Sequence, residues 1–193
     1  MNALSPPSRI VRTVAPLLAL LMALGCSTVV RPFVHLKPDY SELPADALRE
    51  VALEIEKAVQ AGDRDPEIAD RAGLVLGGDA IRQAIRTRAA RAELLNEFLD
   101  AGHAYEGNRG LVVILRTKAY KKATTRHQRD RNALLVMGEN NNRWAIYEGL
   151  IKASALSPKS LSAIQDAFHQ TRVQCMKAGQ KYEDATGEIV VKR

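Results

Sequence analysis

The first 25 residues and the Cys26 that follows them most constrain what this chain can fold into, because residues 1–25 are typical of a segment that is removed from the mature protein. Arg9 and Arg12 open this segment. An apolar run over residues 13–24 follows and leads to Gly25 and Cys26. A cationic start, about 7–15 apolar residues and a small residue at the cleavage point are the parts of a secretory signal. A cysteine directly after that point predicts a bacterial lipoprotein, because its sulfur accepts diacylglycerol.

An ordinary secretory signal or an uncleaved anchor is the alternative interpretation of this segment. A spanning helix is the weaker option, because Pro16 interrupts the apolar run and the run is shorter than the ~20 residues that cross a bilayer core. Ser27, rather than Asp, follows the cysteine, which in Gram-negative lipoproteins goes with the outer membrane. The sequence therefore predicts a protein anchored by lipid to the periplasmic face of the outer membrane.

Without the predicted signal peptide, residues 1–25, the chain keeps 168 of its 193 residues. A chain of about 100–200 residues usually forms one domain with its own core. Residues 26–43 contain Pro32 and Pro38 and little helical periodicity, which predicts a lipidated tether with room for one short docked strand. We therefore expect a single helical domain over residues 44–193.

The mature chain would be modestly basic, with 26 Lys and Arg against 22 Asp and Glu and a net charge of +4. Nucleic acid is not an expected partner in the periplasm, whereas anionic lipid headgroups attract clustered Lys and Arg. Acylation of Cys26 would leave Cys175 without a partner for an intramolecular disulfide. Cys175 could form an intermolecular bond or sense redox state, but its helical spacing from Phe168 favours packing in the core.

Apolar residues recur at intervals of three and four in several segments, which predicts a mostly α fold of about four helices. The expected helices cover residues 44–62, 79–102, 131–154 and 158–177. Beyond Gly179 the period becomes that of strands, and residues 181–191 predict a minor C-terminal β-hairpin. An isolated hairpin is marginal in water, so this one must dock on the helices. Residues 111–115 form a further apolar run of strand length.

Polar residues on a turn and on the third expected helix could form a cluster. Residues 106–110, from Glu106 to Gly110, are expected to form a turn, because they are rich in residues that tolerate positive φ. Asn140, Arg143 and Tyr147 recur at intervals of three and four, so they share one helix face. If the turn folds back on the helix, Arg143 could donate a bidentate hydrogen bond to Glu106, with Asn140 and Tyr147 completing the network. Two interpretations stay open, a structural role that fixes the turn and a ligand or partner site.

Residues 116–131, the basic segment, form the pronounced charge cluster of the chain, with Asp130 as their single acid. A solvated surface is one interpretation of this segment, and contact with anionic lipid or an acidic partner is the other. Its single aromatic residue, Tyr120, is too little to suggest the stacking of nucleic-acid bases. The basic residues are Arg116, Lys118, Lys121, Lys122, Arg126, Arg129 and Arg131.

The sequence contains no recognisable catalytic or metal-binding motif. Its four histidines lie in different segments, and none is paired with a cysteine or an acid at metal-ligand spacing. A GxSxG elbow, a Walker loop and a GxGxxG turn are also absent. We therefore expect no catalytic residue, no cofactor and no metal, and an enzyme of an unrecognised kind is the least favoured alternative.

The order of the motifs resembles the YdbL-like family of uncharacterised periplasmic proteins and lipoproteins, which carry a domain of unknown function. The resemblance covers about residues 81–193. It depends on Glu106 and Gly110 after a helix, on the Asn140, Arg143 and Tyr147 face, and on a tail with Gly179, Gly187 and Lys192. The chain departs from the family where tails tend to have Pro before the Gly and a Trp in each hairpin strand. Here those positions are Ala178, Tyr182 and Val190.

The resemblance implies an accessory role in the cell envelope, because relatives occur alongside AsmA-like proteins that are associated with phospholipid transport between membranes. It brings no catalytic residue with it. We expect a lipid-anchored periplasmic protein that binds an envelope protein and assists an AsmA-like lipid-transport assembly. A module that binds anionic lipid or the cell wall is the alternative.

Overall fold

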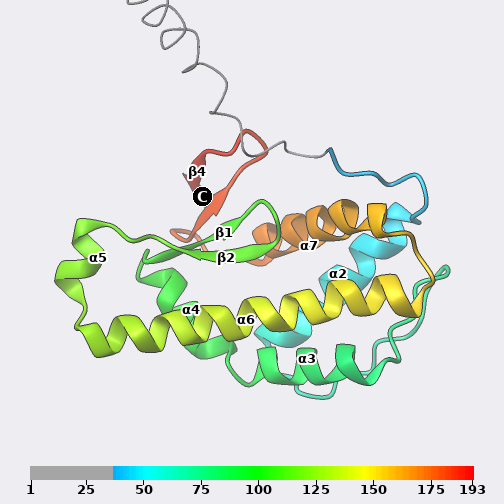
Figure 1. The fold of residues 1–193 in the computed structure, drawn as a ribbon, viewed down its shortest axis with the longest axis horizontal. Helices are drawn as coiled ribbons and strands as arrows, with labels where there is room; N and C mark the ends of the chain where they lie inside the picture. Colours follow the sequence, from blue (N-terminus) through cyan, green and yellow to red (C-terminus); the bar gives the residue numbers. More distant parts are fainter. Residues whose placement is uncertain (1–36) are drawn as a thin grey trace, which may run out of the picture. The chain divides into compact units, whose positions relative to one another are not determined.

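Six α-helices and a four-stranded β-sheet make up residues 37–193, the part of the chain that the computed structural model describes (Figure 1). These residues form one compact unit. The mostly helical class with a minor β element is therefore confirmed. The predicted signal peptide, Cys26 and most of the predicted tether lie outside the described residues.

The first helix, α2 (Ala45–Gln60), packs against the last, α7 (Leu161–Cys175). Leu48, Val51 and Ile55 recur at intervals of three and four along α2 and are buried. They share an apolar cluster with Ile164 and Phe168 of α7. A short 3₁₀ turn (Pro158–Ser160) leads into α7. The apolar residues whose spacing predicted these helices therefore form the face on which the two helices meet.

The second expected helix is two helices, α3 (Asp79–Ala89) and α4 (Ala92–Asp100). Neither Gly nor Pro marks the break, which falls at Ala90 and Arg91. Arg91 leaves helical geometry with φ −114° and ψ 0°. The break lets α3 pack along α6 (Arg126–Ala153), while α4 turns its apolar residues toward the sheet. Tertiary packing, rather than a local signal, explains the difference.

The longest helix, α6, begins five residues before its expected start. Thr125 and Gln128 form a reciprocal cap, because each side chain accepts from the other residue's backbone N–H at 3.2 and 2.8 Å. The short helix α5 (Lys118–Ala123) precedes it and starts at Thr117, whose hydroxyl accepts from Tyr120 N at 3.1 Å. The basic segment is therefore α5 together with the first turns of α6.

The sheet has the strand order β2-β1-β3-β4. The strands β3 (Lys181–Glu183) and β4 (Ile189–Val191) form the predicted C-terminal hairpin. It pairs in parallel with β1 (Ala104–Gly107), which forms an antiparallel hairpin with β2 (Leu111–Ile114). The hairpin therefore extends a sheet, in addition to meeting the helices. Glu106 lies within β1, opposite Val112, and not in the turn where the sequence placed it.

Two apolar clusters fill the interior. The larger lies among α2, α3, α6 and α7, and the smaller lies between α4, the β1–β2 hairpin, α5 and α6. Along α6 the last buried residue of the smaller cluster is Val136, and the first buried residue of the larger cluster is Ile146. Figure 1 shows α6 with α3 on one side and α7 and the sheet on the other. The residues between Val136 and Ile146 therefore lie where the two clusters meet.

Helices α3 and α6 approach closely at Gly149, where an added Cβ would lie 2.6 Å from Cγ1 of Ile81. Alanine normally stabilises a helix by about 1 kcal/mol relative to glycine. We expect Gly149→Ala to do the reverse and to lower the free energy of unfolding by about 1–3 kcal/mol, because it overpacks this contact. Chemical denaturation measures the change.

Gly138→Ala, in the same helix, is the matched control. There the nearest atom to the added Cβ is Nη1 of Arg91, the end of a flexible side chain that can move aside. This variant should be as stable as the wild type or more stable. Equal stability of the two alanine variants would contradict a tight helix contact at Gly149.

Candidate functional site

Arg143 and Glu106 form the bidentate pair that their positions predicted. Nη1 of Arg143 lies 2.6 Å from Oε2 of Glu106, and Nη2 lies 2.8 Å from Oε1. The side chains are 1% and 3% exposed. The pair therefore ties β1 to α6 in the interior of the domain.

The carbonyl oxygen of Gly110 is a second centre of hydrogen bonding. It accepts from the Tyr147 hydroxyl at 2.8 Å, from Arg172 Nη2 at 2.8 Å and from Arg143 Nη1 at 3.3 Å. Gly110 has φ +70°, and an added Cβ would lie 2.8 Å from both the Tyr147 hydroxyl and Arg172 Nη2. Glycine is required here for its conformation and for the close approach of these donors.

Asn140 does not join this network, although it shares a helix face with Arg143 and Tyr147. Its side-chain oxygen accepts from Val112 N at 2.9 Å, and its amide nitrogen donates to Val112 O at 3.0 Å. Asn140 therefore completes the backbone hydrogen bonding of β2 and fixes the hairpin on α6. Of the five predicted cluster residues, the structure brings together Glu106, Gly110, Arg143 and Tyr147.

The Glu106–Arg143 pair is one part of a closed ring in which three acids and three arginines alternate. We call this the charge ring. All six side chains are 4% exposed or less, and their formal charges cancel. In order, the ring consists of Glu56, Arg88, Glu139, Arg143, Glu106 and Arg172, which returns to Glu56.

Short contacts join each member of the charge ring to both of its neighbours. Arg88 holds Glu56 through two hydrogen bonds of 2.9 and 2.8 Å and reaches Glu139 at 2.9 Å. Glu139 also accepts from Arg143 Nε at 2.6 Å. Arg172 donates to Glu56 at 2.9 Å and lies 3.3 Å from Glu106 in an ion contact that lacks hydrogen-bond geometry. The ring joins α2, α3, α6, α7 and β1.

Four members of the charge ring, namely Glu56, Arg88, Glu139 and Arg172, were missed by the sequence analysis. The sequence does indicate that these residues are buried, since each lies on the apolar stripe of its helix. Arg88 follows Ile85 by three residues and Arg172 follows Phe168 by four, and both of those apolar residues are buried. A charge on an apolar stripe needs an opposite buried charge. The sequence does not say which one.

The arginines keep the ring carboxylates ionised. Burial by itself would raise the pKa of Glu106, but the charge and hydrogen bonds of Arg143 outweigh it and lower this pKa to about 2. Arg88 and Arg143 likewise overcome the burial of Glu139 and lower its pKa to about 2. The pKa of Glu56 is lowered too, because Arg88 and Arg172 outweigh its burial. The three ring acids are therefore anions at neutral pH.

This arrangement supports the structural interpretation of the Glu106–Arg143 pair. Ionised carboxylates held by arginines have no proton to exchange near neutral pH. The cavity beside the ring measures about 30 Å³, which is room for water but not for a substrate. The ring joins five elements, as a structural device would, and it offers no open face to a ligand.

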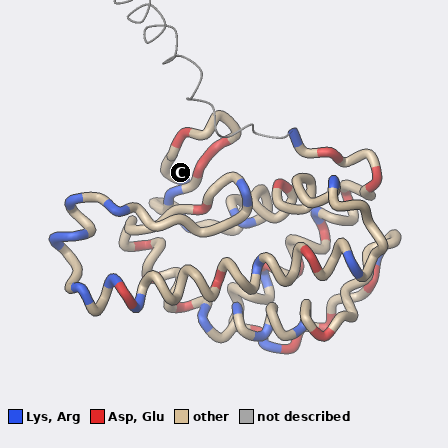
Figure 2. Tube along the Cα trace, viewed as in Figure 1, with Lys and Arg blue, Asp and Glu red and all other residues tan. Residues whose placement is uncertain are grey.

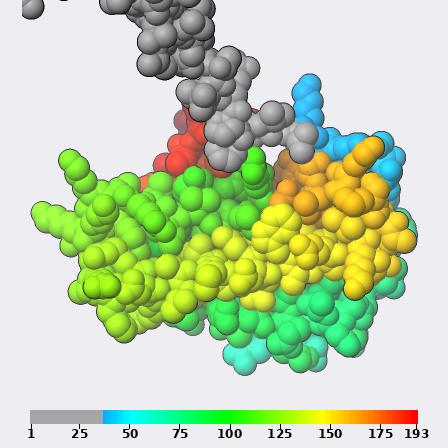
Figure 3. Space-filling view, viewed as in Figure 1, coloured from blue at the N-terminus to red at the C-terminus, as the bar shows by residue number. Residues whose placement is uncertain are grey.

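The basic segment lies on the surface. Six of its seven basic residues are exposed. Arg129 is half-buried, because its guanidinium donates to the carbonyls of Thr124 and Lys121 and so joins α5 to α6. None of the seven forms an ion pair with an acid within residues 37–193. Figure 2 shows the basic positions gathered at the α5 end of the domain, and Figure 3 shows the surface there.

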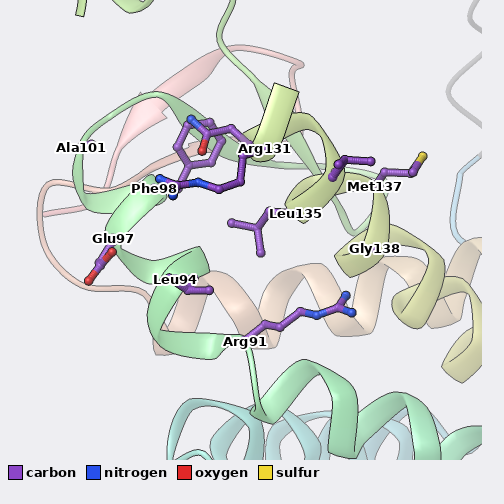
Figure 4. A pocket seen from close by; sticks show the side chains of 11 residues that line it. Arg91, Leu94, Glu97, Phe98, Ala101, Arg131, Leu135, Met137 and Gly138 are labelled. Carbon is purple, nitrogen blue, oxygen red and sulfur yellow. The ribbon is translucent and has the colours of Figure 1, made fainter. Parts of the chain in front are cut away.

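A groove of about 570 Å³ lies beside the basic segment, between α4 and the first half of α6. We call it the α4–α6 groove (Figure 4). Leu94 and Phe98 of α4 and Leu135 and Met137 of α6 provide its apolar walls. The sequence analysis did not predict this groove, because it exists only where the break at Arg91 lets α4 leave the direction of α3.

Cys175 and His169 are shielded from solvent to different extents. Cys175 is half-buried at the end of α7, not in the core as expected, and burial raises the pKa of its thiol. Burial also lowers the pKa of His169, as does the nearby Arg172. Within the described residues, no three His, Cys, Asp or Glu side chains are placed to hold a metal ion. Likewise, none of the helices in residues 37–193 has the length and apolar character to cross a membrane.

No protein-family model, curated protein or solved structure matches the chain. The resemblance to the YdbL-like family stays a prediction.

Breaking the charge ring should destabilise the domain. We expect Arg143→Met to lower the free energy of unfolding by about 3–5 kcal/mol, because Glu106 and Glu139 would lose a shared buried counterion. Arg82→Met is the control, since Arg82 is 60% exposed and pairs with an exposed Asp79. Its effect should stay below about 1 kcal/mol. Thermal and chemical unfolding that shows similar losses for both variants would contradict a structural ring.

The charge ring also predicts how stability depends on pH. Glu106 and Glu139 have pKa values of about 2 in the fold, below the ordinary 4.5. Their contribution is therefore complete above pH 4.5 and is lost as the pH falls from there toward 2. Denaturation curves across this range should show a steep fall for the wild type. Glu106→Gln should be less stable at pH 7 and show a shallower fall, because glutamine does not titrate; equal slopes would contradict the assignment.

Proposed function

We propose that this protein is a lipid-anchored accessory protein of the bacterial envelope that acts by binding another envelope protein, at the periplasmic face of the outer membrane. The N-terminal segment ending in Cys26 supports the anchor. The resemblance to the YdbL-like family supports assistance to an AsmA-like lipid-transport assembly. In this proposal the protein has no catalytic role.

One observation carries the proposal: charged side chains in the interior of the domain are paired with each other, whereas the basic side chains at one end of its surface are not. The charge ring neutralises its own acids and arginines in the interior. The exposed cations of the basic segment have no acidic partner within residues 37–193 and lie beside an apolar groove. A surface of unpaired cations supports binding to an acidic partner surface.

The second candidate function is binding of anionic lipid headgroups or the cell wall through the same basic segment. Its support is the position of Lys118, Lys121 and Lys122 on α5, which projects at one end of the domain (Figure 2). Each basic residue near an anionic membrane surface contributes about 1 kcal/mol of attraction. This attraction falls with ionic strength, so salt separates the two candidates.

Crosslinking in cells tests the protein partner. We expect an envelope protein to be captured by the wild type and lost when Lys121 and Lys122 are both changed to Glu. Lys152→Glu with Lys159→Glu is the matched control, because both lysines are exposed and lie outside the basic segment. Mass spectrometry identifies the captured protein. Palmitate labelling that is present in the wild type and absent from Cys26→Ser is the control for the anchor.

Vesicle sedimentation supplies the other arm of this test. The full chain with Cys26→Ser is mixed with phosphatidylglycerol vesicles at low and high salt. Strong binding that high salt removes, without a captured protein, would favour the second candidate. If neither a protein nor a vesicle is bound through the basic segment, the proposed function is wrong.

A further inference from the structure

The α4–α6 groove has a chemistry that a protein partner at the basic segment does not use. Seven large apolar side chains are exposed within residues 37–193, and three of them border this groove. They are Leu94, Leu134 and Met137, with exposed fractions of 57%, 63% and 55%. Apolar side chains gathered at a hollow, rather than scattered singly, indicate a binding surface.

Two arginines line the groove without a counterion. Arg91 and Arg131 make no side-chain hydrogen bond or ion pair with any residue in the described part of the chain. Each arginine of the charge ring, in contrast, contacts two carboxylates. Glu97 is the acid among the lining residues, and its carboxylate points away from both arginines (Figure 4).

Arg91 lies at the floor of the groove and not at its rim. It is half-buried, and its guanidinium lies against Gly138 of α6, where an added Cβ would be 2.5 Å from Nη1. Figure 4 shows it extended beneath Leu94 and Leu135 toward Gly138. An anion that pairs with Arg91 must therefore enter the groove. A slender chain with a terminal anion can do so, whereas the acidic side chains of a docked helix would stay along the rim.

We propose that the α4–α6 groove binds a single-chain anionic amphiphile of the fatty-acid class. The acyl chain lies on Leu94, Phe98 and Met137, and the carboxylate pairs with Arg91, while Arg131 lines the other end of the groove. The groove, at about 570 Å³, lies within the range of about 300–1,000 Å³ of small-molecule sites. Met137 suits a ligand without fixed shape, because methionine is unbranched and adaptable. This site goes beyond the proposed function and does not depend on the protein partner.

Calorimetric titration of the full chain carrying Cys26→Ser tests the site with three probes. Laurate has both chain and charge, monolaurin has the same chain without charge, and acetate has the charge without the chain. We expect laurate to bind, monolaurin to bind at least ten-fold more weakly, and acetate not to bind. Equal affinities for laurate and monolaurin, or no binding of laurate, would overturn the proposal.

Two pairs of variants distinguish the contribution of the apolar walls to laurate binding from that of the arginines. Leu134→Ser with Met137→Ser should weaken laurate and monolaurin by at least ten-fold, and the exposure of both residues leaves the fold intact. Arg91→Ala with Arg131→Ala should bring laurate to the affinity of monolaurin. The controls are Val113→Ser with Ile189→Ser, which are exposed apolar positions elsewhere, and Arg82→Ala with Arg126→Ala. Laurate binding that the groove variants leave unchanged would place the ligand elsewhere and overturn the proposal.

The other occupants of such a groove are outcomes of the same experiment. If the wild type sediments as a dimer that Leu134→Ser with Met137→Ser dissociates, and laurate does not bind, a second copy covers the groove and the proposal is wrong. Loss of laurate binding together with a retained protein crosslink at the basic segment would overturn this site and leave the proposed function standing. Laurate binding without such a crosslink would support this site and contradict the proposed function.

Discussion

A closed ring of six alternating charges holds this domain together from the inside. Glu56, Glu106 and Glu139 share the three arginines so that each carboxylate contacts two guanidinium groups. Burial of charge is unfavourable unless partners and hydrogen bonds replace the lost water. Here they do so only when α2, α3, α6, α7 and β1 are all in place, since every element supplies a member of the ring. The ring therefore specifies one relative arrangement of these elements, in a way that interchangeable apolar contacts do not.

The ring also separates the two parts of the core. On α6 its members Glu139 and Arg143 lie between Val136 of the smaller apolar cluster and Ile146 of the larger one. Because this polar layer neutralises itself, the interior has no unpaired acid or base at the ring that could act on a substrate. Unpaired charge remains on the surface, at the basic segment and in the α4–α6 groove. Both proposals for function therefore concern binding at the surface.

Local patterns predicted much of the helical structure and the C-terminal hairpin. The apolar stripe of α2 and the strand pairing around Tyr182 depend on residues close together in sequence, so the spacing of apolar residues was enough to predict both elements. The pairing of Glu106 with Arg143 was also predicted, because Arg143 shares a helix face with Asn140 and Tyr147 and the expected turn that carries Glu106 can fold back on that face. The partners Arg88 and Arg172 were not, since pairing across helices depends on how those helices cross. The break at Arg91 has no Gly or Pro signal, and the groove that it creates was missed with it.

The sequence by itself determined the mostly helical class, the sites where most elements end and the positions of the charges. Periodicity and turn chemistry act over a few residues and are therefore visible in the chain. Only the tertiary structure decided which charges became a sealed, neutral ring and which stayed unpaired at the surface, because the energy of a charge depends on its distance to other charges and on its exposure to water. Those two quantities arise only when segments far apart in the sequence are packed together.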